Sequence, residues 1–241
     1  MIVPILAQFF YDQMDSGFVS SGVITIIFGV LFFLSNLDHN KKLSLPQAFL
    51  LTALSWLSIA IFGSLPFVFS NIELSLTDAF FESMSGITTT GSTILTNLNE
   101  TPKAILLWRA MLQWLGGIGI IVMAITLMPI MNIGGMLLFK VLNTDSSEEI
   151  LPSSKEISLK LILIYFVLTF LCALAYKIFG MGYFDSLTHS MTTIATGGFS
   201  NYNESIGHFN NVKIEITAML FIILGSCLLY TSPSPRDQRG S

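Results

Sequence analysis

A short polar segment that ends in threonine and glycine occurs twice in the sequence. The first copy runs from Asp78 to Gly91 and the second from Asp185 to Gly198, and the offset is constant, because 185 − 78 and 198 − 91 both equal 107. Backbone carbonyls of a Thr-Gly stretch can replace the hydration shell of an alkali cation, and glycine leaves room for the backbone to turn toward the ion. These residue types indicate ion coordination rather than the making or breaking of bonds.

Stretches of this composition also occur at helix contacts and in ordinary turns, which is the simpler explanation of a single copy. Two copies in register, each between two long apolar runs, instead favour a pair of re-entrant pore loops. Residues 78–86 and 185–193 would then form short half-helices. Asp78 and Asp185 would lie in their first turns, where a carboxylate caps free N–H groups and complements the helix dipole.

Other polar residues near these segments have two interpretations each. Glu82 and His189 share a repeat position, since 189 − 82 is also 107. They either tune the electrostatic field near the outer mouth of a pore or form hydrogen bonds with neighbouring loops. We favour the hydrogen bonds. Arg109 and Gln113 lie four residues apart on one helix face. For Arg109 we favour snorkelling to headgroups or a structural ion pair, with Glu82 as the sharper candidate, over a direct functional role.

The composition is that of an integral membrane protein. Hydrophobic residues make up 52% of the chain and charged residues only 11%, with a mean hydropathy of +0.72, far from the roughly 25% charged content of soluble domains. A net charge of -4 without a basic stripe excludes nucleic acid as a partner. The two cysteines and three histidines are scattered, so we expect no enzyme activity.

Five apolar runs are long enough to cross a bilayer core of about 30 Å as helices. They are Phe18–Leu34, Pro46–Phe69, Ala104–Met131, Ser158–Phe179 and Val212–Tyr230, the last interrupted by Glu215. The residues before 18 form either the end of a helix whose beginning is missing or an interfacial helix. Lysines in or beside the 36–45 and 139–157 loops place both loops in the cytoplasm and the repeated segments outside.

We therefore predict an all-α, polytopic membrane protein with pseudo-repeated span–pore loop–span units. The predicted divisions are N-terminal extra membrane helices in 1–45, the first of them truncated, a first unit in 46–138, a cytoplasmic linker in 139–157, a second unit in 158–226 and a non-native tail in 227–241. The linker either contacts a cytosolic partner or is simply solvated. The tail abandons the apolar pattern abruptly, which is why it is excluded from the fold.

Three motifs carry a family resemblance. They are Asp-Ala-Phe-Phe-Glu-Ser-Met-Ser-Gly-Ile-Thr-Thr-Thr-Gly-Ser (78–92), Leu-Trp-Arg-Ala-Met-Leu-Gln-Trp-Leu-Gly-Gly-Ile-Gly-Ile (107–120) and Ile-Ala-Thr-Gly-Gly-Phe-Ser (194–200). Together with Trp56 and Leu65-Pro66-Phe67, they closely resemble the TrkH branch of the Trk/Ktr/HKT potassium transporters. The resemblance runs from the N-terminus to about Ser226.

The resemblance implies four span–pore loop–span units around one potassium pathway, of which this chain holds two. The selectivity filter would comprise Thr88, Thr89, Thr90, Gly91, Ala195, Thr196, Gly197 and Gly198, with K+ held at Thr89, Thr90, Gly91, Thr196, Gly197 and Gly198, and pore-helix support from Asp78, Glu82, Asp185 and His189. Potassium is the transported ion, and no organic cofactor is implied. The implied partners are a second copy of the full-length protein and a cytosolic TrkA-type nucleotide-binding regulatory subunit, in a bacterial cytoplasmic (inner) membrane.

Other functions stay open at this point. A member that conducts sodium or mixed cations would have the same layout, because selectivity depends on filter geometry that a sequence gives poorly. A non-conducting scaffold would use the Thr-Gly loops as mere turns. A dimer of this chain alone, with two pore loops from each copy, is the least favoured arrangement.

Overall fold

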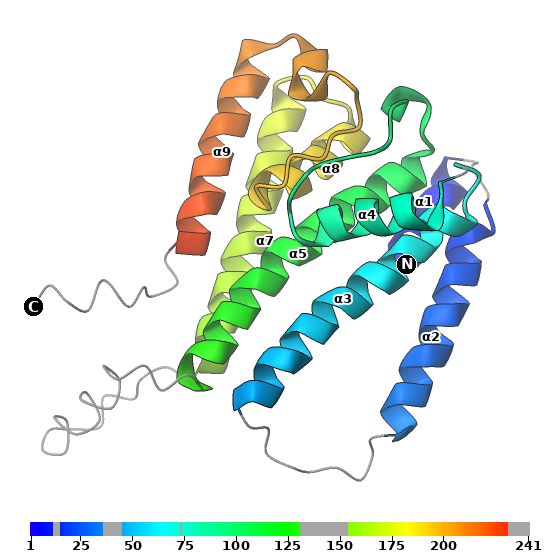
Figure 1. The fold of residues 1–241 in the computed structure, drawn as a ribbon. Coiled ribbons are helices and arrows are strands. Elements are labelled where there is room, and N and C mark those ends of the chain that lie inside the picture. The colour runs from blue at the N-terminus through cyan, green and yellow to red at the C-terminus, as the bar shows by residue number, and fades with distance from the viewer. Residues whose placement is uncertain (12–14, 36–44, 73, 131–153, 231–241) are drawn as a thin grey trace, which may run out of the picture.

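The computed structural model describes residues 1–11, 15–35, 45–72, 74–130 and 154–230, and the regular elements in these ranges are all helices (Figure 1). The α-helices are α1 (Ile2–Phe10), α2 (Gly17–Ser35), α3 (Leu45–Phe69), α4 (Leu76–Ile87), α5 (Lys103–Ile130), α7 (Ser154–Ile178), α8 (Tyr183–Ile194) and α9 (Val212–Tyr230), with short 3-10 helices η1 (Leu98–Glu100) and η2 (Ser205–Phe209). The expected all-α fold is confirmed.

Four of the described helices are long and apolar enough to cross a membrane, namely α2, α3, α5 and α7. Their bounds agree with the predicted apolar runs to within one residue for α2, α3 and α5, whereas α7 begins at Ser154, four residues before the predicted start. The fifth predicted span, α9, is a helix of 19 residues but is not one of the four.

The repeated segments form helices that are too short to span the bilayer. α4 and α8 have 12 residues each, about 18 Å at the rise of an α-helix, against a bilayer core of about 30 Å. Their bounds keep the offset of the repeat, since 183 − 76 and 194 − 87 both equal 107. Figure 1 shows both of them in the upper half of the bundle. They are the half-helices that the repeated segments predict.

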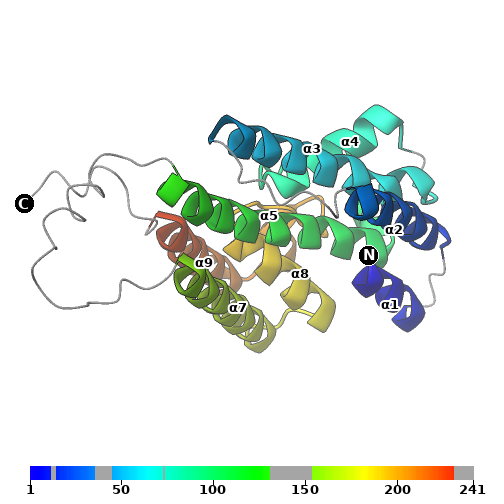
Figure 2. The ribbon, with the colours of Figure 1, turned by 90° about the horizontal axis from the view of Figure 1, so that it is seen from below.

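Helix α5 is shared by the two units. Figure 2 shows it between α3 and α4 on one side and α7, α8 and α9 on the other. One core packs α5 against α2, α3 and α4, through Phe18, Phe67, Ala79, Ala104, Ile105, Trp108 and Leu112. The other core joins Ile121 of α5 to the second unit, through Tyr165, Cys172, Tyr176, Met181, Ile194, Ile214, Ala218 and Leu228. Each half-helix thus sits in its own core, and α5 fixes one relative to the other.

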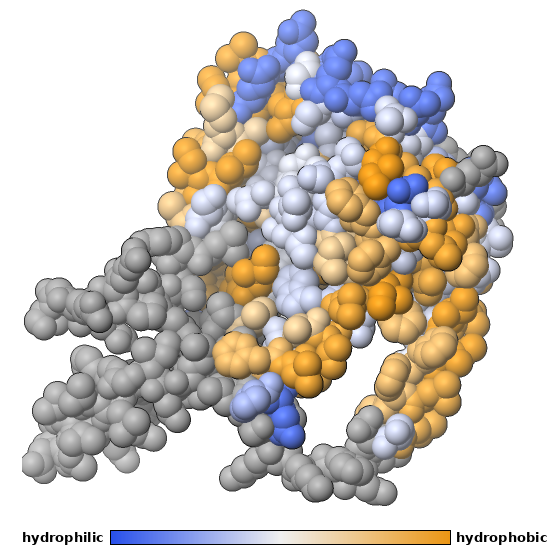
Figure 3. All heavy atoms as spheres, viewed as in Figure 1, coloured by the Kyte–Doolittle hydropathy of each residue, from blue (hydrophilic) through white to orange (hydrophobic). Residues whose placement is uncertain are grey.

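The outer faces of the long helices carry many large apolar side chains that no other described residue covers, on α2, α3 and α7 above all. Figure 3 shows the hydrophilic residues gathered at the upper end of the molecule, above the apolar helices. A surface of this kind suits lipid around the helices and water at their ends. The chain is therefore a multi-pass membrane protein.

Some predictions fall on segments outside the described residues. These segments are 36–44, with Lys41 and Lys42, 131–153, which holds most of the predicted linker, and 231–241, which holds most of the predicted tail. At the N-terminus, α1 has nine residues, which is too short for a span. It packs against α2 and α5.

Candidate functional site: two loops that meet

The two half-helices end in the same way. In both, two backbone hydrogen bonds close the last turn as a Schellman motif, in which the chain leaves the helix through a left-handed residue. The four bonds are Thr89 N–H to Gly86 O (3.0 Å) and Thr90 N–H to Ser85 O (2.9 Å) in α4, and Thr196 N–H to Thr193 O and Gly197 N–H to Thr192 O (both 3.0 Å) in α8. The offset of 107 thus extends from residue types to backbone hydrogen bonds.

The backbone beyond each half-helix alternates in the sign of φ. Thr89 and Thr196 have φ of 55° and 54°, and Gly91 and Gly198 both have φ of 80°, while the residues between them are not in the positive region. A β-branched residue at positive φ is a rare, strained conformation that costs about 1–3 kcal/mol. Such strain persists where the surroundings impose it, and it gathers at ligand sites.

The extended backbone begins later than the sequence predicts. Thr88 and Ala195 were expected in the extended loops, but both still have helical or near-helical dihedrals, with φ −82° and ψ 3° at Thr88 and φ −69° and ψ −8° at Ala195. The Schellman bonds hold them in the last turn. The N-terminal cap of α4 also differs, because Ser75 rather than Asp78 is the cap residue, and its Oγ accepts the N–H of Asp78 at 3.1 Å.

The two loops touch each other through their backbones. A Cβ atom added at Gly91 would overlap the carbonyl oxygen of Gly197, whereas one added at Gly198 would meet nothing within 4 Å. Gly91 is therefore required for the close approach of the loops as well as for its positive φ. Thr88, Thr90 and Gly198 are exposed in this chain, while Gly197 is buried. The structure brings the predicted filter residues together at one place.

Each loop is also fastened to its half-helix by a side chain at the same repeat position. The Thr93 hydroxyl donates to Glu82 Oε1 at 2.9 Å, and the Ile94 N–H donates to Glu82 Oε2 at 2.9 Å. In the second unit, His189 Nε2 and Ser200 Oγ lie 3.0 Å apart. Thr93 and Ser200 are in register, since 200 − 93 is 107. Neither residue was predicted from the sequence, although a hydroxyl residue at both positions of the repeat would have indicated them.

Arg109 connects both fastenings. Its Nε lies 2.7 Å from Glu82 Oε1, its Nη2 donates to Thr93 Oγ1 at 2.9 Å, and its Nη1 donates to the Ser200 carbonyl at 2.9 Å. The Arg109 and Glu82 side chains are 1% and 0% exposed. Snorkelling to headgroups is therefore wrong for Arg109, because the loops that follow both half-helices fold over it, and the pairing with Glu82 is confirmed.

Gln113 lies one turn further along α5 and contacts the second loop. Its Oε1 accepts the Phe199 N–H at 3.0 Å, and a Cβ at Gly197 would overlap its amide group. Gln113 is fully buried, and its Nε2 has no hydrogen-bond partner among the described residues. Since the Phe199 N–H needs an acceptor, the orientation of the amide is fixed, and the Nε2 donor faces the loops.

Asp185 organises the loop that follows the second filter segment. Its two carboxylate oxygens accept from Asn201 Nδ2 at 2.9 Å and from the Tyr202 hydroxyl at 3.2 Å, so it acts on the loop rather than on free N–H groups of α8. Burial and the Asp185 carboxylate raise the pKa of Tyr202. The Tyr202 hydroxyl therefore keeps the proton that it donates.

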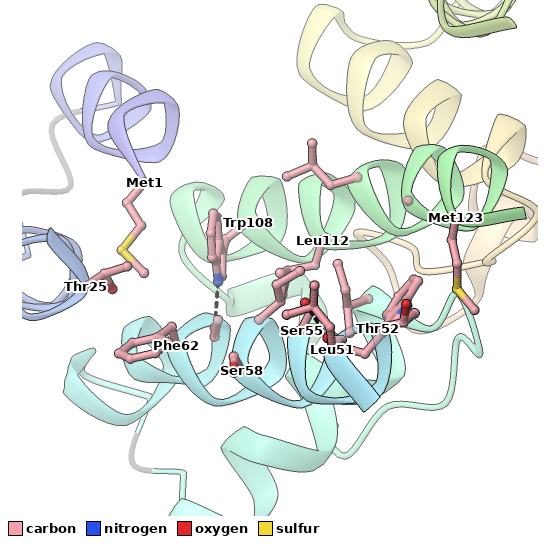
Figure 4. Close-up of a pocket in the computed structure, with 16 residues that line it drawn as sticks. Met1, Thr25, Leu51, Thr52, Ser55, Ser58, Phe62, Trp108, Leu112 and Met123 are labelled. Atoms are coloured by element: carbon pink, nitrogen blue, oxygen red, sulfur yellow. Dashed lines mark hydrogen bonds between the residues drawn. The ribbon is translucent and has the colours of Figure 1, made fainter. Parts of the chain in front are cut away.

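A separate apolar cavity of about 770 Å³ lies among α2, α3 and α5 (Figure 4). Trp56, Phe62 and Leu112 are among its lining residues, and the Trp108 indole crosses from α5 to donate to the Gly63 carbonyl of α3 at 2.9 Å. A desolvated cation needs oxygen ligands around it. The walls of this cavity are too apolar for that, so the candidate ion site is the pair of loops.

These features define a polytopic membrane protein built from span, half-helix and span units whose loops meet. The family model described as "TrkH: Cation transport protein" matches residues 15–228. The chain belongs to the TrkH family of cation transport proteins.

Relatives and a solved structure agree with this assignment. The chain is 41% identical over 230 residues to the Trk system potassium uptake protein TrkH of Halomonas elongata, a match that covers 94% of this chain and 48% of the relative. For the TrkH protein of Escherichia coli K12 the identity is 39% over 231 residues, with the same coverage. The crystal structure of the potassium transporter TrkH from Vibrio parahaemolyticus is 38% identical, with a TM-score of 0.81, over 92% of this chain and 45% of that one. The chain thus spans about half the length of the relatives it matches, which are uptake proteins rather than enzymes.

Proposed function

We propose that the chain supplies two of the four loops of a potassium pathway, in which backbone oxygens coordinate a dehydrated potassium ion. One observation carries the proposal: two loops with the same capping bonds and the same alternation of φ meet where Gly91 touches the Gly197 carbonyl. Strained backbone of this kind is typical of a ligand clamp. The names of the relatives supply the ion, since they are potassium uptake proteins.

The half-helices support this role electrostatically. Their C-terminal ends carry a partial negative charge and point at the loops, which favours a cation there. The ion sheds water at the outer mouth, is held by the carbonyls and moves down its electrochemical gradient. The filter residues are Thr88, Thr89, Thr90, Gly91, Ala195, Thr196, Gly197 and Gly198, with Asp78, Glu82, Asp185 and His189 in support. The exposed sides of Thr88, Thr90 and Gly198 would face the remaining units.

The complete assembly belongs to the same proposal. It comprises four units, of which 46–138 and 158–226 are two, in a subunit that forms a homodimer in a bacterial cytoplasmic membrane and works with a cytosolic TrkA-type nucleotide-binding subunit. Family membership supports this arrangement.

A chimera tests the proposal with a complete pathway. Residues 1–228 replace the matching half of the Escherichia coli TrkH protein, and uptake of rubidium, as a potassium tracer, and of sodium is measured in cells that lack other potassium uptake systems. We expect rubidium uptake well above sodium uptake. A chimera that reaches the membrane in normal amount but takes up neither ion, or both equally, would overturn the proposal.

The variant Gly198→Ser separates a filter from a mere turn. Gly198 has positive φ and open space around a Cβ, and so does Gly180, which lies outside the loops and has φ of 109°. Both substitutions impose the same kind of backbone strain. We expect Gly198→Ser to lower the rubidium-to-sodium uptake ratio and Gly180→Ser to leave it unchanged. If the chain is a non-conducting scaffold, both variants change protein amount alone.

A further inference from the structure

We propose that Arg109 is a positioning residue that ties the two filter loops together and thereby sets the discrimination of potassium from sodium. The inference rests on the proposed function. It assigns a role to a residue outside the filter that touches neither the ion nor the filter positions themselves. Its basis is the set of three groups that one guanidinium holds, which belong to three different parts of the site.

The three contacts reach one half-helix and both loops. Glu82 belongs to α4, Thr93 to the loop after α4, and the Ser200 carbonyl to the loop after α8. The two loop contacts stand at equivalent places, each two residues beyond a filter glycine, because 93 − 91 and 200 − 198 both equal 2. A shift of either loop would break a charge-assisted hydrogen bond in a buried site, which is stronger than an ordinary one.

The planar fork of an arginine suits this task, because it directs several N–H groups at fixed angles. The ring of Phe199, one residue beyond Gly198, also lies under the guanidinium, with the ring centroid 4.2 Å from Cζ. A lysine could keep the charge and the pair with Glu82, but a single ammonium cannot reproduce the three directed contacts. Arg109→Lys therefore removes the geometry and keeps the charge.

The positive charge of Arg109 is balanced by Glu82, which explains how a guanidinium can lie beside a pathway for cations. Glu82 neutralises Arg109 within a contact that water does not reach, so the pair presents no net charge to a passing ion. The second unit has no equivalent pair: position 189 is histidine, and α9, which starts 109 residues after α5, has Ala218 at the position of Arg109. Among the described residues, Arg109 is thus the guanidinium that serves both loops.

The test uses the chimera and reads the ratio of rubidium to sodium uptake together with the amount of protein in the membrane. We expect Arg109→Lys to lower the ratio about threefold to tenfold, as the net loss of one typical hydrogen bond implies, at an unchanged protein amount. The matched control is Lys103→Gln, which removes an exposed positive charge from the first turn of the same helix. It should keep the ratio of the unmodified chimera.

A more conservative pair of substitutions, at Thr93, tests the inference if Arg109→Lys does not fold. Thr93→Val keeps the side-chain shape and removes the hydroxyl that joins Glu82 and Arg109, whereas Thr93→Ser keeps that hydroxyl. We expect a reduced ratio for the valine variant and a normal ratio for the serine variant. If Thr93→Val and every folded Arg109 variant keep the normal ratio, the inference is wrong. An unmodified chimera without potassium preference would instead contradict the proposed function itself.

Discussion

Positions 82 and 189 show how one structural role is met by different side chains. Both lie on the buried face of a half-helix and both bond to a hydroxyl residue 11 positions later. In the first unit the residue is an ionised partner of Arg109, while in the second it is a histidine whose ring nitrogens lie close to the Asp185 carbonyl and the Ser200 hydroxyl. The loop is fastened in both cases, but only the first unit needs a counter-ion for a guanidinium.

A second buried bond anchors α8 from the neighbouring span. The hydroxyls of Tyr176 and Thr193 lie 2.8 Å apart, and Thr193 is also the residue whose carbonyl accepts the Thr196 N–H. We expect Tyr176→Phe to destabilise the protein by about 1–3 kcal/mol, because it leaves a buried threonine hydroxyl without that partner. The measurement is thermal unfolding of the purified protein in detergent.

Tyr183→Phe is the control for this variant. Tyr183 is 80% exposed, so removal of its hydroxyl should change the free energy of unfolding by less than about 0.5 kcal/mol. Equal effects of the two substitutions would show that the Tyr176 contact contributes nothing specific.

At the scale of elements, the sequence predicts the helices well and their contacts poorly. Apolar runs predict α2, α3 and α5, and the repeated segments predict α4 and α8, because buried and lipid-facing positions require apolar residue types. The left-handed conformation of Thr89 and Thr196 could not be predicted, since threonine rarely adopts a positive φ. The contact of Arg109 with the Ser200 carbonyl is also invisible, because any residue at 200 offers a carbonyl.

Two glycines let the second long helix of each unit approach its half-helix. A Cβ at Gly116 of α5 would overlap the Ile87 carbonyl, and a Cβ at Gly225 of α9 would come within 2.7 Å of the Ile194 carbonyl. Ile87 and Ile194 are the last residues of α4 and α8. Both glycines therefore allow close approach at the ends of the half-helices from which the loops start.

We expect Gly116→Ala to destabilise the protein by about 1–3 kcal/mol, because backbone must move to admit the methyl group. Gly29→Ala is the matched control: it lies in the middle of α2 with nothing within 4 Å of an added Cβ, and alanine is the better helix former. Thermal unfolding in detergent should show a lower midpoint for Gly116→Ala and an equal or higher one for Gly29→Ala. A similar midpoint for both would contradict the close packing of α5 on the end of α4.

For the whole molecule, the two units run in the same direction. Figure 1 shows α3 and α7 rising from the lower end, α5 returning to it, α9 running back toward it, and both half-helices in the upper half of the molecule. In each unit the first long helix rises and the second descends, so the units are parallel repeats related by an axis along the membrane normal rather than inverted ones. Loops that enter from one side can meet at one level, as Gly91 and Gly197 do.

This direction, combined with the lysine-rich loops, predicts which residues face outside. Asn99 and Glu204 are exposed and lie in the segments that join α4 to α5 and α8 to α9, and Ser35 is the last residue of α2. Figure 1 shows both joining segments toward the upper end of the molecule and the end of α2 at the lower end. Single cysteines at these three positions, in a Cys227→Ser background, report their side through a membrane-impermeant maleimide, since Cys172 is buried. We expect Asn99→Cys and Glu204→Cys to react in intact cells and Ser35→Cys to react only after the cytoplasmic membrane is opened.

The comparison of Asn99→Cys with Glu204→Cys decides the symmetry by itself, because each position belongs to a different unit. Parallel units require both to react from the same side, whichever side that is, while inverted units require opposite sides. Reaction of Ser35→Cys in intact cells would reverse the orientation and leave the parallel relation standing. Opposite reactivity of the two upper positions would separate the loops by the thickness of the membrane, and a shared ion pathway through them would then be impossible.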